Sequence, residues 1–152
     1  MEQDKHIVKS YDEEMKEINN SILDIGSLVE NQLKDALGTL KNQDTELADK
    51  VIQADDLIDE KFRELDQKLV LILGKRQPMA TDLRTIFSAI KMNKDLERLG
   101  DHSTNIAKRT ALIELVLPEK PVRDILRMGE HVQVMIAKVI QSFVNFSACR
   151  KV

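Results

Sequence analysis

Two pairs of carboxylates in this sequence have the spacing of metal ligands on helices. Asp55 and Asp59 are four residues apart, and so are Glu97 and Asp101, so the members of each pair lie one helical turn apart on the same side. Hard cations such as Mg²⁺, Mn²⁺ or iron need several oxygen ligands that converge from different directions. The four acids therefore predict a metal site between two neighbouring helices. For Asp55 and Asp59, the alternative is a solvated acidic flank, which is ordinary on helix surfaces.

One helical stripe in segment 78–112 changes from apolar to polar half-way along. At 100° per residue, its members are Met79, Leu83, Ile86, Ile90, Asn93, Glu97, Asp101 and Thr104. The stripe predicts that Glu97 and Asp101 lie on the inner face of this helix, while apolar residues of the second half gather on the opposite side. Buried carboxylates are costly without partners, so this position requires a cation or a solvated groove.

No other residues in the sequence form a catalytic set. None of the three histidines has a glutamate three residues before it, so the Glu-x-x-His pairs of di-iron bundles are absent. His102 adjoins Asp101, but neighbouring helical residues do not face the same way, which favours a surface histidine. Gly74-Lys75 lacks the other residues of a phosphate loop, and no Cys-x-x-Cys or nucleophile elbow is present. We therefore predict a binding protein that is not an enzyme.

Two alternatives to a metal-binding adaptor use the same residues. A metal-dependent phosphohydrolase could combine Arg76 and Arg84 with the acids further along, but the acidic face offers no His or Cys as a base. A purely structural helical scaffold would keep its apolar repeat, whereas the seam of the third helix breaks at Asn93. Both features disfavour the alternatives.

The composition predicts an all-α protein. Hydrophobic residues make up 42% of the 152 residues and charged residues 32%, whereas aromatics reach 3% and Trp is absent, a profile poor in strand formers. The net charge of −3 argues against binding to nucleic acid. Cys149 is the single cysteine and cannot form an internal disulfide, and neither a signal peptide nor a membrane span is visible. We expect a soluble, cytoplasmic protein in which Cys149 is a small buried residue.

Apolar residues at steps of three and four, with breakers between the runs, predict four long helices and no strand. The predicted helices span residues 7–41, 44–74, 78–112 and 120–146. Asp44 is placed to cap the second helix, Gly74 to end it and Pro78 to open the third. Ala54 belongs to the predicted apolar seam of the second helix. Because the first three helices are joined by only a few residues, they must pack as an antiparallel bundle.

The fourth predicted helix resembles the first at a fixed offset of 103 residues. Such an offset suggests an internal duplication, and the alternative is chance agreement between two amphipathic helices. The identical pairs are Gly26 with Gly129, Val29 with Val132, and Asn42 with Asn145.

The duplication predicts a three-helix repeat over 1–116 and an incomplete second repeat over 117–152, whose last residues, 149–152, are expected to be poorly ordered. The fourth helix then exposes an apolar face unless the first bundle or another molecule covers it. Such a patch favours association into a homodimer. The residues expected on this face are Val132, Ile136 and Phe143.

Segments 75–84 (KRQPMATDLR) and 95–101 (DLERLGD) resemble the two signatures of the PhoU family of bacterial phosphate-signalling regulators. Upstream, 42–44 (NQD) and 55–59 (DDLID) are similar to the first repeat of that family, so the resemblance covers essentially the whole chain. It implies two tandem three-helix bundles related by pseudo-twofold symmetry.

The resemblance also implies a metal site and a regulatory role. The family's acidic motifs are matched here by Asp55 with Asp59 and Glu97 with Asp101, and imply a hard divalent or trivalent ion (iron, manganese or magnesium) in a multinuclear site. The implied role is a non-enzymatic negative regulator that links a phosphate ABC transporter ATPase to a sensor histidine kinase, at the inner membrane only through these partners. The sequence departs from the family because a second set of acids would lie beyond Val152, so no second metal site is expected here.

Overall fold

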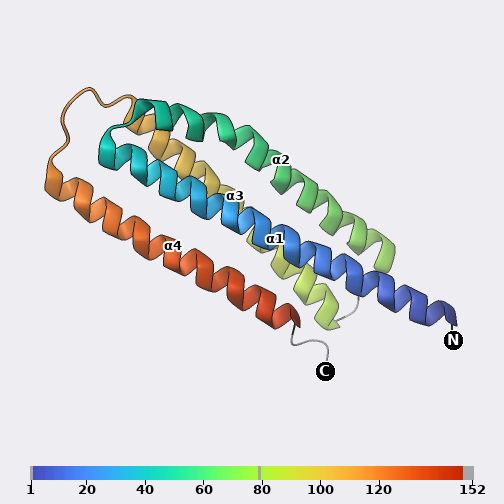
Figure 1. The fold of residues 1–152 in the computed structure, drawn as a ribbon. Coiled ribbons are helices and arrows are strands. Elements are labelled where there is room, and N and C mark those ends of the chain that lie inside the picture. The colour runs from blue at the N-terminus through green and yellow to red at the C-terminus, as the bar shows by residue number, and fades with distance from the viewer. Residues whose placement is uncertain (1, 79, 149–152) are drawn as a thin grey trace.

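The computed structural model describes residues 2–78 and 80–148, and the side chains of 11–78 and 82–146. Within these residues it contains four helices and no strand, which confirms the predicted all-α fold. The helices are α1 (Glu2–Asn42), α2 (Thr45–Arg76), α3 (Ala80–Ala111) and α4 (Glu119–Ala148) (Figure 1). Cys149 and the rest of 149–152, for which burial and poor order are expected, lie outside the described residues.

The turn between α1 and α2 is tight and closed by hydrogen bonds. Gln43 adopts a left-handed conformation (φ 50°), and the backbone N–H of Asp44 donates to the carbonyl of Thr39 at 3.1 Å. The side chain of Asp44 caps α2, as predicted, by accepting a hydrogen bond from the N–H of Leu47 at 2.9 Å. The turn therefore reverses the chain within a few residues.

The predicted end of α2 at Gly74 is wrong. The helix continues to Arg76, and Gln77 caps it in a left-handed conformation (φ 43°) with its N–H donated to the carbonyl of Leu73. Glycine is common at such a cap because it has no Cβ, but here a glutamine takes that conformation. Pro78 consequently lies in the connection and does not open α3.

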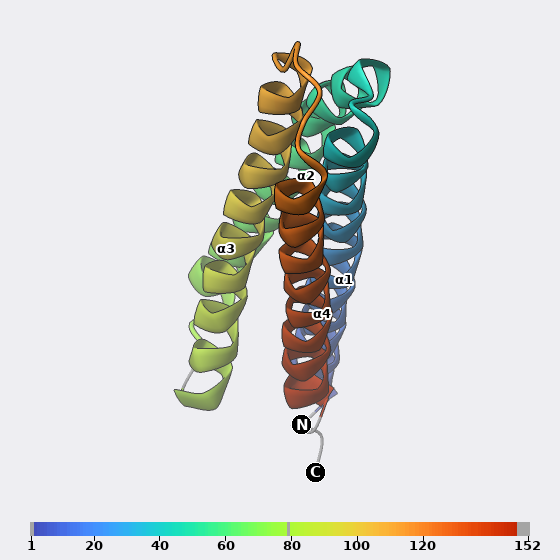
Figure 2. The same cartoon turned by 90° about the vertical axis from the view of Figure 1, so that its left-hand side faces the viewer.

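Helices α1, α2 and α3 pack against one another as a three-helix bundle, and α4 packs along α1 on the outside of it (Figures 1 and 2). The three helices of the bundle alternate in direction, as their short connections require (Figure 1). Fully buried side chains come from all three, among them Ile22 and Val29 of α1, Leu65 and Leu69 of α2 and Ile86 of α3. The bundle thus places α2 and α3, which carry the acidic pairs, next to each other.

The packing of α4 on α1 depends on one glycine from each helix. A Cβ atom at Gly26 would collide with Ile140 of α4, and one at Gly129 would collide with Leu37 of α1. Gly129 lies 103 residues after Gly26, and Ile140 lies 103 residues after Leu37, so the contact of Gly26 with Ile140 is equivalent to the contact of Gly129 with Leu37. The contact surface between α1 and α4 is therefore built by equivalent residues of the two helices.

A hydrogen bond between the same helices joins two further counterparts. Gln133 Nε2 of α4 donates to the backbone carbonyl of Glu30 of α1 at 3.4 Å, across a sequence separation of 103. A contact between counterparts lies on the axis that interchanges them. Helices α1 and α4 are thus related by a local pseudo-twofold axis, as a duplicated unit would be.

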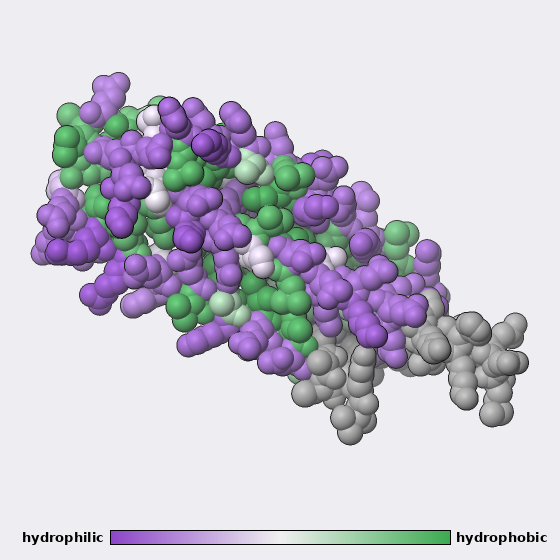
Figure 3. All heavy atoms as spheres, viewed as in Figure 1, coloured by the Kyte–Doolittle hydropathy of each residue, from purple (hydrophilic) through white to green (hydrophobic). Residues whose placement is uncertain are grey.

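The first bundle covers part of the apolar face expected to be exposed on α4. Ile136 and Phe143 are buried against α1, with 6% and 7% of their surfaces exposed, and Val132 is partly buried. The free face of α4, which points away from α1, is also apolar, and its side chains are 43–68% exposed. In Figure 3, groups of apolar side chains lie between hydrophilic ones along the edge of the molecule where α4 lies. The free face consists of Ile125, Met128, Met135, Val139 and Phe146.

Candidate metal centre

The structure brings the two acidic pairs of α2 and α3 within electrostatic reach of each other. The pKa of Asp59 is raised above its ordinary value, first by burial and then by the negative charges of Asp55, Asp101 and Glu97, while Arg63 lowers it. Such interactions weaken with distance, so all three carboxylates lie near Asp59. We call the four residues Asp55, Asp59, Glu97 and Asp101 the acidic strip.

Glu97 and Asp101 lie on a flank of α3, and the prediction that they lie on its inner face is wrong. The Glu97 side chain is 32% exposed, and Asp101 is exposed. The buried residues instead repeat every seven positions, as in a left-handed helical bundle, whereas a straight helical wheel drifts by about 20° per heptad. The buried face of α3 consists of Ile86, Ala89, Asn93, Leu96, Gly100, Ser103, Ala107 and Thr110, with the buried Thr85 and Thr104 beside them.

Asp55 is held by two side chains from the other helices of the bundle. Gln32 of α1 donates through Nε2 to Asp55 Oδ1 at 3.1 Å and to Thr104 Oγ1 at 2.9 Å. The hydroxyl of Thr104, on α3, donates to the same Asp55 Oδ1 at 2.8 Å. Asp55 is accordingly half-buried, whereas Ala54, which the sequence pattern assigns to the buried seam of α2, is exposed.

Sequence reasoning missed Gln32, although a signal was available. Gln32 occupies a position between Val29 and Ala36 in the apolar row of α1, and it is 4% exposed. A glutamine in such a row needs a buried hydrogen-bond partner. Its partners, Asp55 and Thr104, lie on the same helices as the predicted ligands.

Glu97 is bound by a lysine one turn earlier on α3. Lys94 Nζ lies 2.9 Å from Oε1 and 2.7 Å from Oε2 of Glu97. This hydrogen bond raises the pKa of Lys94, to which the charges of Glu97, Asp101 and Asp66 also contribute. With 67% of its side chain exposed, Lys94 is free to move away from Glu97 into solvent. Lys94 therefore places one positive charge on the acidic strip, and a bound cation could take its place at Glu97.

The donor set near the strip suits a hard cation only if neutral oxygens take part. In the described part of the chain, no three His, Cys, Asp or Glu side chains form a group that could hold an ion. However, Gln32 Oε1 and Asn93 Oδ1 are buried without a hydrogen-bond partner. Gln32 contacts Asp55, and Asn93 lies one turn before Glu97 on α3. Because amide oxygens are ordinary ligands of hard cations, these two oxygens are candidate neutral ligands beside the carboxylates.

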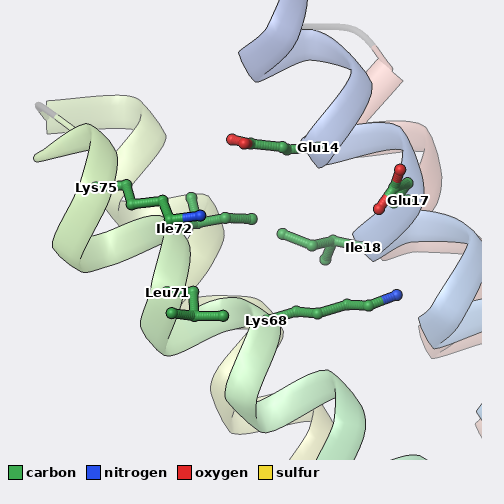
Figure 4. A pocket seen from close by; sticks show the side chains of 7 residues that line it. All are labelled: Glu14, Glu17, Ile18, Lys68, Leu71, Ile72 and Lys75. Atoms are coloured by element: carbon green, nitrogen blue, oxygen red, sulfur yellow. The ribbon is translucent and has the colours of Figure 1, made fainter.

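A separate hollow of about 130 Å³ lies between α1 and α2, near the C-terminal end of α2 (Figure 4). Lysine side chains of α2 and glutamates of α1 line it around an apolar floor. Beside it, Arg76 donates two hydrogen bonds of 3.0 Å to the carboxylate of Glu14, a bidentate pair that ties the end of α2 to α1. The lining residues are Glu14, Glu17, Ile18, Lys68, Leu71, Ile72 and Lys75.

The arginines of the hydrolase alternative are not beside the acidic strip. Arg76 is bonded to Glu14 and lies roughly 26 Å from Asp59 along α2, at 1.5 Å per residue. Arg84 is exposed and lies roughly 20 Å from Glu97 along α3 by the same measure. A phosphoryl group held at the strip would therefore be out of reach of both guanidinium groups.

Among the described residues, none of the helices has both the length and the apolar character that crossing a bilayer requires.

Comparison with known proteins matches residues 22–110 to the PhoU domain family. The chain is 36% identical over 143 residues to the phosphate-specific transport system accessory protein PhoU homolog of Rhizobium meliloti, covering 93% of this chain and 60% of that protein. It is 38% identical over 140 residues to the phosphate-specific transport system accessory protein PhoU of Serratia marcescens, covering 91% of this chain and 57% of that protein. The chain thus spans about 60% of the length of these relatives.

The fold agrees with the sequence comparison. The crystal structure of PhoU from Pseudomonas aeruginosa superposes with a TM-score of 0.84 at 35% identity, over 90% of this chain and 66% of that one. The family match over residues 22–110 contains both acidic pairs, and it covers α1 from residue 22, all of α2, and α3 up to residue 110. The chain belongs to the PhoU domain family.

Proposed function

We propose that this chain is a non-enzymatic regulatory protein of phosphate-specific transport. It restrains phosphate uptake and phosphate-starvation signalling by binding both the ATPase of a phosphate ABC transporter and a sensor histidine kinase. The family and the names of the relatives support the link to phosphate transport. The proposed mechanism rests on the acidic strip, in which carboxylates from two helices of the bundle act on one another electrostatically.

In this proposal the acidic strip binds one or more hard cations, iron, manganese or magnesium. Asp55, Asp59, Glu97 and Asp101 would supply carboxylate oxygens, and the bound ion would neutralise the repulsion that, together with the larger effect of burial, raises the pKa of Asp59. Lys94 would leave Glu97 when the ion binds, since both compete for the same two oxygens. Ion binding thereby makes the charge on this side of the bundle less negative, which alters the surface offered to protein partners.

We expect the double variant Glu97→Ala, Asp101→Ala to lose metal after purification, and to lose the increase in thermal midpoint that Mn²⁺, Mg²⁺ or Fe³⁺ gives the wild type. A ligand that binds only the folded state stabilises it by mass action. The matched control is Glu60→Ala, Glu64→Ala, which removes two exposed acids at the same spacing from α2. Metal content by elemental analysis and thermal unfolding with and without chelator measure the effect.

The variant Lys94→Met tests the metal site in the opposite direction, because it should increase the affinity for metal. Because it removes the cation that competes for Glu97, we expect it to bind Mn²⁺ more tightly than the wild type. The metal assignment fails if the wild-type midpoint does not respond to metal, and the double alanine variant is more stable yet still binds the transporter ATPase. The strip would then be only a solvated acidic face.

We propose further that residues 117–152 are the start of a second repeat equivalent to 1–116. The interchangeable contacts of Gly26 and Gly129 at the α1–α4 surface support this division. On α4, the free face corresponds by the same offset to the face of α1 that α2 and α3 cover, as in Ile125 with the buried Ile22. A face of this kind is suited to pack against further helices.

We expect the 152-residue chain to form a homodimer through the free face of α4. Its apolar residues at steps of three and four favour pairing with a helix of a second copy. Sedimentation equilibrium should give a dimer for the wild type and for the control Arg123→Glu, an exposed polar position. The variant Met135→Glu, Val139→Glu should be a monomer, because it places charges in the apolar contact. A monomeric wild type contradicts the proposal.

A further inference from the structure

Gln32 is a polar side chain at a buried position of the bundle, where an apolar side chain would pack equally well. It is 4% exposed and occupies a core row of α1 whose nearest members are Val29 and Ala36, both fully buried. Burying a primary amide is unfavourable unless its donors and its acceptor are all paired. A role beyond filling space is therefore required to explain a glutamine here.

The donors of Gln32 are paired, and they act on one atom of the acidic strip. Nε2 donates to Asp55 Oδ1 and to Thr104 Oγ1, and the Thr104 hydroxyl donates to Asp55 Oδ1. Both hydrogen bonds to the carboxylate fall on Oδ1, so the ring of three side chains restrains Asp55 and makes no hydrogen bond to Oδ2. Hydrogen bonds of this kind orient a metal-binding carboxylate.

The acceptor of Gln32 is not paired. Its Oε1 is buried without a hydrogen-bond partner, and it lies against α3 at Gly100, the residue before Asp101. A Cβ atom at position 100 would be 3.1 Å from Oε1, which is tighter than ordinary contact, so glycine makes room for the amide there. The bundle thus keeps a buried carbonyl oxygen next to Gly100 of α3, one residue before Asp101, and no hydrogen-bond donor of the described residues pairs with it.

We propose that Gln32 is part of the cation site, as the contribution of α1. Its amide nitrogen positions Asp55, and its amide oxygen is a neutral ligand for the hard divalent cation that the strip binds. The inference rests on the proposed metal-binding function. It explains the unpaired Oε1, because an amide oxygen is a good ligand for a hard cation. It also makes the site a contact between all three helices of the bundle, so that ion binding ties α1 to α2 and α3.

The variant Gln32→Met tests the proposal with little change in side-chain volume. It removes the donor to Asp55 and the amide oxygen together. We expect its dissociation constant for Mn²⁺, measured by isothermal titration calorimetry on the full chain, to rise about 10–100-fold, the usual loss when an orienting partner of a metal ligand is removed. The control Gln133→Met removes a partly buried amide from the α1–α4 contact and should bind Mn²⁺ like the wild type.

The variant Gln32→Glu gives a second readout that does not depend on the fold of Gln32→Met. In chelator, its thermal midpoint should fall below that of the wild type, because a carboxylate faces Asp55. Mn²⁺ should raise that midpoint by more than it raises the wild-type midpoint, because the new carboxylate is an additional ligand. A purely structural Gln32 predicts the same loss with and without Mn²⁺.

The outcomes separate this inference from the proposed function. If the wild type binds Mn²⁺ and Gln32→Met binds it equally tightly, the inference is overturned and the metal site stands without Gln32. An equal loss of midpoint for Gln32→Glu with and without Mn²⁺ overturns it as well. If the wild type itself binds no Mn²⁺, the proposed metal function fails, and the role of Gln32 fails with it.

Discussion

The Gly129→Val variant is expected to lose about 1–3 kcal/mol of unfolding free energy, the usual cost of overpacking a close contact, and to loosen α4 from α1. A side chain at position 129 would collide with Leu37, which is itself buried with 7% of its surface exposed. Because a buried leucine has little room to rotate, the helices must separate. Urea unfolding measures the loss, and amide hydrogen exchange should show α4 opening more readily than α2.

The control for this variant is Gly74→Val. Gly74 is also helical and exposed, and a Cβ atom there meets nothing within 4 Å, so this variant carries the change in helix propensity without the collision. The counterpart variant Gly26→Val should lose a similar amount, because Gly26 meets Ile140 as Gly129 meets Leu37. Equal stability of the variants at positions 74 and 129 contradicts the prediction.

Asp59→Asn is expected to change the stability of the protein in opposite directions with and without metal. The raised pKa of Asp59, caused first by burial and then by Asp55, Asp101 and Glu97, means that its charged form is less favourable in the folded state than in the unfolded chain. In chelator at pH 7, the asparagine variant should therefore be more stable than the wild type. With Mn²⁺ at a hundred times its dissociation constant, the wild type should gain about 2.7 kcal/mol, and the variant much less.

The pH dependence of this difference follows from the direction of the shift. An acid whose folded pKa is raised destabilises the fold most at pH values above that pKa, and the effect disappears as the pH falls towards 3.8, the ordinary pKa of an aspartate. The advantage of Asp59→Asn in chelator should accordingly be largest near neutral pH and vanish near pH 4. In Mn²⁺, the wild-type gain should also shrink on acidification, because protons compete for the same oxygens.

Thermal unfolding from pH 4 to pH 8 measures both effects. The control Asp49→Asn neutralises an exposed aspartate of the same helix and should follow the wild type in chelator and in Mn²⁺. If Asp59→Asn is less stable than the wild type in chelator at every pH, the charged form of Asp59 is not disfavoured in the folded state, and the prediction is wrong.

The amino-acid sequence alone was sufficient to predict the four helices, their order and the antiparallel bundle. These depend on local properties, namely the apolar spacing, the cap at Asp44 and the short connections, so they could be read without knowledge of the packing. The pairing of Asp55 with Asp59 and of Glu97 with Asp101 was predictable for the same reason, because residues four apart share one side of any helix. The exact end of α2 was not, since Gln77 adopts a left-handed conformation that glycine would usually take.

What only the tertiary structure decided is how each helix is turned towards its neighbours. A straight helical wheel placed Glu97 and Asp101 inside, whereas the supercoiled bundle buries Gly100 and Ser103 and leaves both acids on the flank. The partners of Asp55 are separated from it by 23 and 49 positions in the chain, in Gln32 and Thr104. Periodicity fixes which residues of one helix lie together, but contacts between helices depend on their relative rotation and spacing, and these arise only when the three helices pack.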